Sequence, residues 1–206
     1  MGLEWLVSTS GVRYRRHVMT RRVILVLSVV LVLVVGGAVA VVATSRPDLE
    51  DGRARVDSRW AALRLPLASR YDGLTQLAEA LGAAGAGDRT YTVDLADEVG
   101  TWRELASRSD PDPAAEVAAA NRLEGLAART RINVARSARL SRDPGVAASL
   151  AAFDSALVPT DEVDAYTRAV RRYQSTRTDT LKQVSADLLG YDARPVLLVG
   201  ITPLAG

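Results

Sequence analysis

The feature that most constrains this chain is an apolar run at residues 23–43, which has the sequence VILVLSVVLVLVVGGAVAVVA and no charged residue. At about 1.5 Å per residue, a helix of this run is roughly 31 Å long, which matches a hydrocarbon core about 30 Å thick. Gly36 and Gly37 are tolerated in such a helix, because lipid offers the backbone no alternative to intrahelical hydrogen bonds. The run therefore predicts a single transmembrane helix over 23–43.

The charges on either side of the run predict its orientation. The basic residues before it are Arg13, Arg15, Arg16, Arg21 and Arg22. After it come Arg46 and then Asp48, Glu50 and Asp51. By the positive-inside rule, the N-terminus lies in the cytoplasm and the C-terminal domain lies on the other side of the cell membrane. The alternative is a cleaved signal peptide with Ala38-Val39-Ala40 as its cleavage site, although signal-peptide apolar regions are usually only about 7–15 residues long.

The basic segment before the run, residues 1–22, is expected to be a short cytoplasmic arm. Translation could begin at Met1 or at Met19. A start at Met19 gives a compact anchor sequence, and residues 1–18 would then be an over-extension of the true start. The formal net charge of the whole chain is +2, and the arginines of the arm account for its positive sign. The body of the chain is mildly acidic, so we expect no nucleic acid as a partner.

Composition narrows the chemistry that is available to the body of the chain. The sequence has no cysteine, and its one histidine, His17, lies in the basic N-terminal stretch. Disulfides, thiolate nucleophiles, cysteine-based metal sites and a Ser-His-Asp triad are therefore excluded for this chain alone. We expect a protein that is not an enzyme and that uses no cofactor and no metal.

After Pro47 the apolar residues recur every three or four positions, which predicts amphipathic helices. The first helix is expected over about 48–81, with a kink at Pro66, and Gly82–Gly87 is interpreted as a linker that ends it rather than as a phosphate-binding loop. Further helices are expected at about 91–107, 114–140, 146–157 and 160–188. Asp112 followed by Pro113 predicts an N-cap and a first helical residue.

The expected fold is all-α, because no segment alternates apolar and polar residues well enough to predict a sheet. It consists of an N-terminal single transmembrane helix followed by an antiparallel four-helix-type bundle over 47–190. Residues 191–206 form a C-terminal tail, in which the apolar stretch 196–201 is expected to pack back on the bundle or to pair as an edge.

Two segments carry a family resemblance. Residues 56–81 match a Val-x-x-x-Trp-x-x-Leu/Ile-x-x-x-Leu-x-x-Arg-x-Asp helix, and residues 163–198 match a Tyr-x-x-x-Val-x-x-Tyr helix with a Gly-aromatic ending. The matching residues are Val56, Trp60, Leu63, Leu67, Arg70, Asp72, Tyr166, Val170, Tyr173, Gly190 and Tyr191. On these residues the chain resembles a divergent member of the LemA family of bacterial membrane proteins. It departs from the family at Thr75 and Gln76, where the family has Pro-Asn.

The resemblance implies a membrane-anchored helical bundle without enzymatic activity. We therefore expect a single-pass cell-envelope protein whose extracytoplasmic bundle acts as an interaction or scaffold module, linked to envelope maintenance. Its partners are expected to be the membrane and other envelope proteins, with a homo-oligomer as a further option. The matching residues are interpreted as structural determinants, and the ligand-binding residues are unknown at this stage.

Charged clusters offer two alternative functions. Asp94, Asp97 and Glu98 share one helical face, but a calcium site needs more ligands, so an acidic first helical turn is the preferred interpretation. Two arginine runs would suit a sensing or binding domain for an anionic envelope ligand, either a lipid or a cell-wall polymer, if both lay on one face, but the acidic residues between and around them favour salt-bridged, solvated surfaces. The runs are Arg129, Arg131, Arg136, Arg139 and Arg142, and Arg168, Arg171, Arg172 and Arg177.

Overall fold

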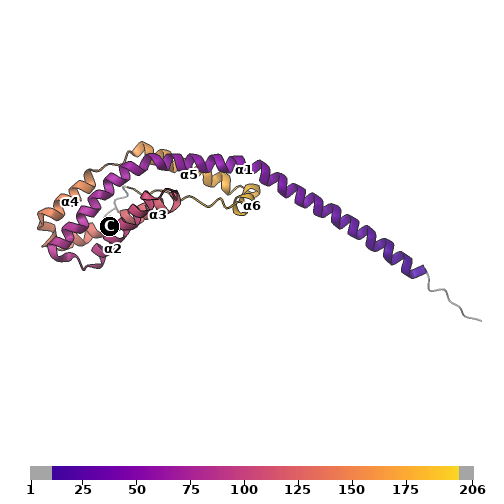
Figure 1. Cartoon of the computed structure of the whole chain (residues 1–206), viewed down its shortest axis with the longest axis horizontal. Coiled ribbons are helices and arrows are strands. Elements are labelled where there is room, and N and C mark those ends of the chain that lie inside the picture. The colour runs from indigo at the N-terminus through magenta and orange to yellow at the C-terminus, as the bar shows by residue number, and fades with distance from the viewer. Residues whose placement is uncertain (1–10, 200–206) are drawn as a thin grey trace, which may run out of the picture. The chain divides into compact units, whose positions relative to one another are not determined.

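The structure is a computed structural model that describes residues 11–199. The side chains at 11–26, 29, 34–35, 38–39, 180 and 181 lie outside the description. Residues 11–199 form helices joined by turns, followed by an extended C-terminal segment, and contain no strand (Figure 1). The prediction of an all-α chain is confirmed for this range.

The helices are α1 (Gly11–Leu81), a π-helical turn η1 (Gly82–Ala86), α2 (Thr90–Ser107), α3 (Pro113–Arg136), a 3₁₀ turn η2 (Leu140–Arg142), α4 (Pro144–Ser155), α5 (Thr160–Arg177) and α6 (Thr180–Leu188). The chain divides into two compact units, Met1–Pro47 and Asp48–Gly206. Helix α1 therefore contributes residues 48–81 to the second unit, which also contains all the other helices.

The predicted transmembrane helix falls within the first unit, and the prediction of a single-pass cell-membrane protein is contradicted. No helix in the described part of the chain has a stretch both long enough and apolar enough to cross a membrane. Such a stretch needs about 20 consecutive apolar residues, and the side chains described within 23–43 form only short pieces such as 30–33. The side chains at 23–26, 29, 34–35 and 38–39 lie outside this finding. The cytoplasmic and extracytoplasmic assignments of the two ends depended on the span and are withdrawn with it.

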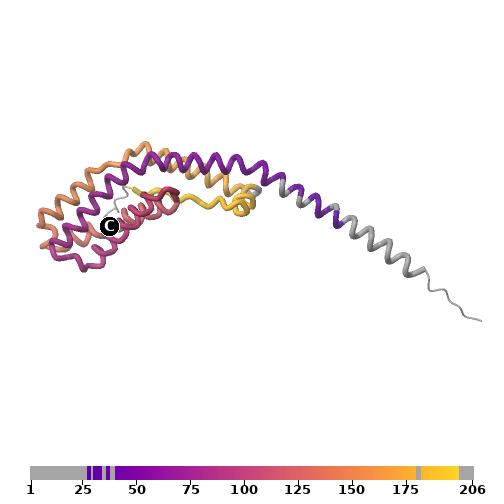
Figure 2. Tube along the Cα trace, viewed as in Figure 1, coloured from indigo at the N-terminus to yellow at the C-terminus, as the bar shows by residue number. Residues whose placement is uncertain are grey.

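Contact pairs along α1 give the direction of each helix beside it. The pairs are Arg64–Ala106 and Tyr71–Trp102 with α2, Trp60–Glu116 and Arg70–Glu124 with α3, Gly73–Phe153 with α4, and Gly52–Tyr173 with α5. Along α1 from lower to higher residue number, the contacting residues of α3 also rise in number. Those of α2 fall in number, and so do those of α5 followed by α4. Helix α3 is therefore parallel to α1, whereas α2, α4 and α5 are antiparallel to it. Figure 2 shows α4 and α5 following one another alongside α1.

Local sequence explains where the helices begin and end. The predicted N-cap is confirmed, since the Asp112 carboxylate accepts the N–H groups of Ala114 and Ala115, each at 3.1 Å, and the same Asp-Pro arrangement starts α4 at Asp143. The prediction of one helix over 160–188 is wrong, because the chain breaks after Arg177. There the Thr178 hydroxyl and backbone N–H both donate to the Gln174 carbonyl, each at 2.9 Å.

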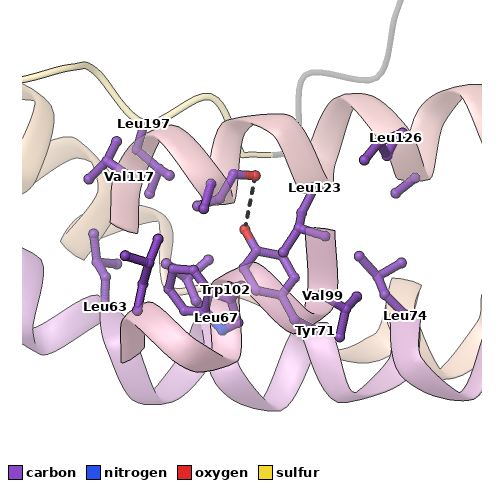
Figure 3. Packing of buried hydrophobic residues seen from close by; sticks show 14 of the residues in the cluster. Leu63, Leu67, Tyr71, Leu74, Val99, Trp102, Val117, Leu123, Leu126 and Leu197 are labelled. Carbon is purple, nitrogen blue, oxygen red and sulfur yellow. Dashed lines mark hydrogen bonds between the residues drawn. The ribbon is translucent and has the colours of Figure 1, made fainter. Parts of the chain in front are cut away.

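The core of the second unit lies between α1 and the helices beside it, and aromatic residues fill its centre (Figure 3). The Trp60 ring lies 6.2 Å from that of Trp102 and 5.6 Å from that of Tyr166. Tyr71 meets Trp102 edge-on at 5.1 Å, an arrangement that the ring quadrupoles favour. One continuous core therefore joins the first and last long helices of the unit.

Gly73 marks a close approach between α1 and α4. A Cβ atom there would lie 2.9 Å from the Phe153 backbone nitrogen and 3.0 Å from its Cα. We expect Gly73→Ala to lower the free energy of unfolding by about 1–3 kcal/mol through overpacking. Gly100→Ala should raise it by up to about 1 kcal/mol, because nothing lies within 4 Å of that site and alanine favours helix. Chemical denaturation of both variants measures the difference, and shifts of the same sign would contradict this packing.

Candidate anion-binding groove

Most of the family-matching residues lie in the core rather than at a surface site. The buried ones are Val56, Trp60, Leu63, Leu67, Arg70, Tyr166, Val170, Tyr173 and Tyr191. Asp72 is exposed and pairs with Arg103 at 3.2 Å, while Gly190 has a φ of +69° at the end of α6. The structure therefore brings these residues together as packing and does not gather them around a cavity.

A buried carboxylate that sequence reasoning missed lies beneath Trp60. Glu116 is fully buried, and its Oε2 atom accepts the Trp60 indole N–H at 2.6 Å and lies 3.0 Å from the Arg64 Nε. The other oxygen, Oε1, has no hydrogen-bond partner in the described part of the chain. The only sequence signal for Glu116 is an acidic residue in the first turn of a helix, and that pattern gives no hint of burial. We interpret the contacts of Trp60 and Arg64 with Glu116 as a structural link between α1 and α3.

Arg70 joins three helices. Its Nε donates to one oxygen of Glu124 at 2.8 Å, and its Nη2 donates to the other at 3.1 Å. Its Nη1 donates to the carbonyls of Phe153 and Ala156, at 2.9 and 3.2 Å, and the guanidinium carbon lies 3.8 Å from the centre of the Phe153 ring. The side chain therefore fixes α3 and the end of α4 against α1, and its donors are used within the fold.

Two core tyrosines are held as neutral hydrogen-bond donors. Burial, followed by the nearby charge of Glu124, raises the pKa of Tyr71 well above its usual value, and its hydroxyl donates to the Ala120 carbonyl at 3.4 Å. Burial likewise raises the pKa of Tyr166, whose hydroxyl donates to the Pro195 carbonyl at 2.8 Å. Neither phenol is poised to exchange a proton near neutral pH.

The three carboxylates on α2 line a cavity of about 420 Å³ between α2 and α3. Glu98 is already bound there by Arg122, whose Nε lies 2.9 Å from the carboxylate. Among the described residues, no group of three acidic, histidine or cysteine side chains is placed to hold a metal ion. Asp94 and Asp97 therefore share a face with Glu98 without converging on a common point.

The two arginine runs do not share one face. In the first run, Arg131 pairs with Asp154, and Arg139 donates to the Gly85 carbonyl at 3.0 Å. The positive φ of Gly85, +70°, marks the turn that follows α1. The bond from Arg139 therefore holds this turn in place. The second run instead meets arginines of α1 that the sequence did not single out.

The meeting point is a groove between α1 and α5, here called the arginine groove. Its lining residues are Arg55, Arg59, Ala165, Arg168, Ala169 and Arg172, around a cavity of about 180 Å³. Each helix supplies two arginines four residues apart, which places both side chains on one helical face. The two alanines form a low floor that leaves room between the longer side chains.

The positive charge of the arginine groove is poorly balanced. Arg59 has one carboxylate nearby, that of Glu162, at the long distance of 4.0 Å. Arg55, Arg168 and Arg172 form no ion pair with any residue that the structure describes. A second cavity of about 210 Å³ shares two of these arginines and extends the groove to Asp48 and Asp51. An anion in the groove would relieve the mutual repulsion of the guanidinium groups.

Comparison of the chain with models of known families, with curated proteins and with solved structures gives no match. Any ligand of the groove must therefore be inferred from the groove's own chemistry. Guanidinium groups form paired hydrogen bonds with carboxylates and phosphates.

Proposed function

We propose that residues 48–199 form an antiparallel four-helix-type bundle, with α4 and α5 together as the fourth helix, that serves as a non-enzymatic interaction module for an acidic partner. The observation that carries the proposal is the arginine groove, where four guanidinium groups from two helices surround one hollow. Each group offers five N–H donors and keeps its charge at every physiological pH. Carboxylates and phosphates are the ligands that fit this donor set.

The core beneath the groove supports a preformed site. Trp60 is the residue after Arg59, and Tyr166 lies two residues before Arg168. The two rings pack against each other, so the two helices hold their spacing without a ligand. The four arginines are exposed to solvent. An exposed ion pair contributes only about 0–1 kcal/mol, so useful affinity needs several contacts at once. We therefore expect moderate binding that weakens with salt.

The family assignment is a further part of this proposal. We propose that the chain is a divergent member of the LemA family and that its bundle acts as an interaction or scaffold module. The support is that the two motif segments, 56–81 and 163–198, pack against each other through Trp60 and Tyr166. A sensing role for an anionic ligand is the second candidate, and the same groove would serve it.

The test is binding of two probes, a fluorescent oligo-glutamate peptide and inorganic tripolyphosphate, to the full chain at low salt. We expect Arg55→Ala combined with Arg172→Ala to weaken binding by about tenfold or more, because two of the four guanidinium groups are lost. The matched control combines Arg142→Ala with Arg171→Ala, which removes the same charge outside the groove. It should change affinity by less than about twofold.

The outcome separates the possibilities. Preference for the peptide favours an acidic protein partner, and preference for tripolyphosphate favours a phosphate-bearing ligand. Equal weakening in both double variants would show that net charge rather than the groove attracts the probes. That result, or no binding of either probe to the wild-type chain, would overturn the proposal.

A further inference from the structure

The C-terminal segment 191–198 is extended and lies against three helices of the second unit. Helix α6 ends at Leu188 and is followed by a turn at Gly190, whose φ of +69° suits a residue without a side chain. The Tyr191 N–H donates back to the Ala186 carbonyl at 2.9 Å. After α6 the segment turns back and runs beside α3 (Figure 1). A segment without secondary structure needs other partners for its backbone groups.

Side chains of α3 and α5 provide those partners. The bonds run from Arg177 to the Tyr191 carbonyl (2.8 Å), Tyr173 to Asp192 (2.9 Å), Gln174 to Arg194 (2.8 Å), Tyr166 to Pro195 (2.8 Å) and Asn121 to Val196 (2.8 Å), and the Leu198 N–H donates to Asn121 Oδ1 (2.7 Å). Recognition through main-chain groups does not depend on the sequence of the segment. Proteins that bind extended peptides use the same principle.

Three side chains of the segment are buried in a regular register. Tyr191, Arg194 and Leu197 are 8%, 5% and 4% exposed, whereas the residues between them are more accessible. A period of three is typical of a polyproline II chain, and Pro195 lies within the segment. Figure 3 shows Leu197 entering the core beside Val117 of α3.

The central anchor of the segment is charged. The Arg194 guanidinium donates to the Asp57 carboxylate of α1 at 3.1 Å, but its Nε finds no acceptor among the described residues. The Arg194 side chain is buried but that of Asp57 is 31% exposed, so solvent screens the pair, and the unfilled donor lowers its contribution to stability further. What such a pair does provide is selectivity for one register and for one side chain.

We propose that this groove between α1, α3 and α5, here called the tail groove, is a binding site for extended peptides of the pattern Tyr-x-x-Arg-Pro-x-Leu. Residues 191–198 occupy it as an exchangeable internal ligand. The bound segment defines the chemistry of the partner: an aromatic residue, then arginine and proline three and four positions later, then leucine. The proposal does not depend on anion binding in the arginine groove.

An internal ligand competes with any partner, because tethering gives it an effective concentration of the order of millimolar. Exchange therefore requires that the segment open locally while the helices remain folded. Such sub-global openings are expected where a segment is held by hydrogen bonds that solvent can reach, and those of residues 191–198 are only part-buried or exposed. The segment should open far more often than the unit unfolds.

The chain has no native cysteine, so a single introduced thiol can report this opening in the full chain. Leu197→Cys places the thiol on the segment, and Leu123→Cys, in the fully buried core of α3, is the matched control. We expect a thiol reagent to modify position 197 at least about tenfold faster than position 123, because position 123 is exposed only by larger openings. A peptide with the sequence of residues 190–199 should accelerate modification at 197 by capturing the vacant groove, and the same peptide with Arg194→Glu should not.

A measurement on the unaltered chain guards against loosening by the Leu197→Cys substitution. Native-state hydrogen exchange should show the Leu198 amide opening more often than the α3 amides, and the 190–199 peptide should increase its exchange. Exchange of Leu198 only through global unfolding would overturn the proposal. Equal effects of the two peptides on the thiol at position 197 would also overturn it.

Discussion

Trp60→Ala is expected to lower the free energy of unfolding by about 3–5 kcal/mol. The indole is 1% exposed and contacts the rings of Trp102 and Tyr166, so its removal opens a cavity where α1, α2 and α5 meet. It also removes the donor that lies 2.6 Å from the buried Glu116 carboxylate. Both losses act in the same direction, since a buried carboxylate depends on its hydrogen bonds.

Denaturant unfolding followed by circular dichroism measures this effect. Leu65→Ala is the matched control on the same helix, because that side chain is 80% exposed and should change stability by no more than about 0.5 kcal/mol. Trp60→Phe keeps a ring and loses the N–H, so its stability should fall between those of the wild type and Trp60→Ala. A Trp60→Ala midpoint equal to that of the wild type would exclude the indole from the core.

Arg70→Leu is expected to cost about 3–5 kcal/mol, the usual penalty for breaking a buried ion pair from one side. It leaves the Glu124 carboxylate, whose side chain is 12% exposed, without its paired hydrogen bonds. It also strips the Phe153 and Ala156 carbonyls of a donor at the end of α4. The carboxylate, not the missing contacts of arginine, dominates the loss.

The double variant with Arg70→Leu and Glu124→Leu checks this cause. It should be more stable than Arg70→Leu alone, because no uncompensated charge remains. Arg103→Leu is the comparison at the surface: its pair with Asp72 joins side chains that are 54% and 66% exposed, and about 0–1 kcal/mol is expected. If Arg70→Leu is as mild as Arg103→Leu, α1, α3 and α4 do not depend on this bridge. The measurement is again the denaturant midpoint.

Periodicity alone predicted most of the helices and much of the core, but not the break between α5 and α6. The apolar stripe of the first helix is buried along with Tyr166 and Tyr173, because a 3.6-residue repeat determines which side chains face inward before any partner is known. The Asp112 cap was likewise readable, since a cap depends on neighbouring residues only. Hydropathy, applied in the same local way, led to the contradicted membrane span.

The sites escaped sequence reasoning because they depend on pairing between distant segments. Arg55 and Arg59 look like ordinary solvated residues until antiparallel packing brings them opposite Arg168 and Arg172. The tail groove has no recognisable sequence pattern, because its side chains bind backbone carbonyl groups, which every residue carries. The sequence left open whether the stretch 196–201 packs back or pairs as an edge. Val196, Leu197 and Val199 pack against the core, while 200–206 lie outside the described residues.

The central place of α1 has a consequence for synthesis. Its contacts reach Phe153 at one end and Tyr173 near the other, so the apolar stripe of the first helix is covered only when the last third of the chain exists. At ~5–20 residues per second, that interval is on the order of ten seconds. During this time α2, α3 and then α4 become available in turn, but part of the stripe stays uncovered until α5 exists, so the nascent chain presents apolar surface to other chains. We therefore expect the core of the second unit to be completed only after α5 has been synthesised.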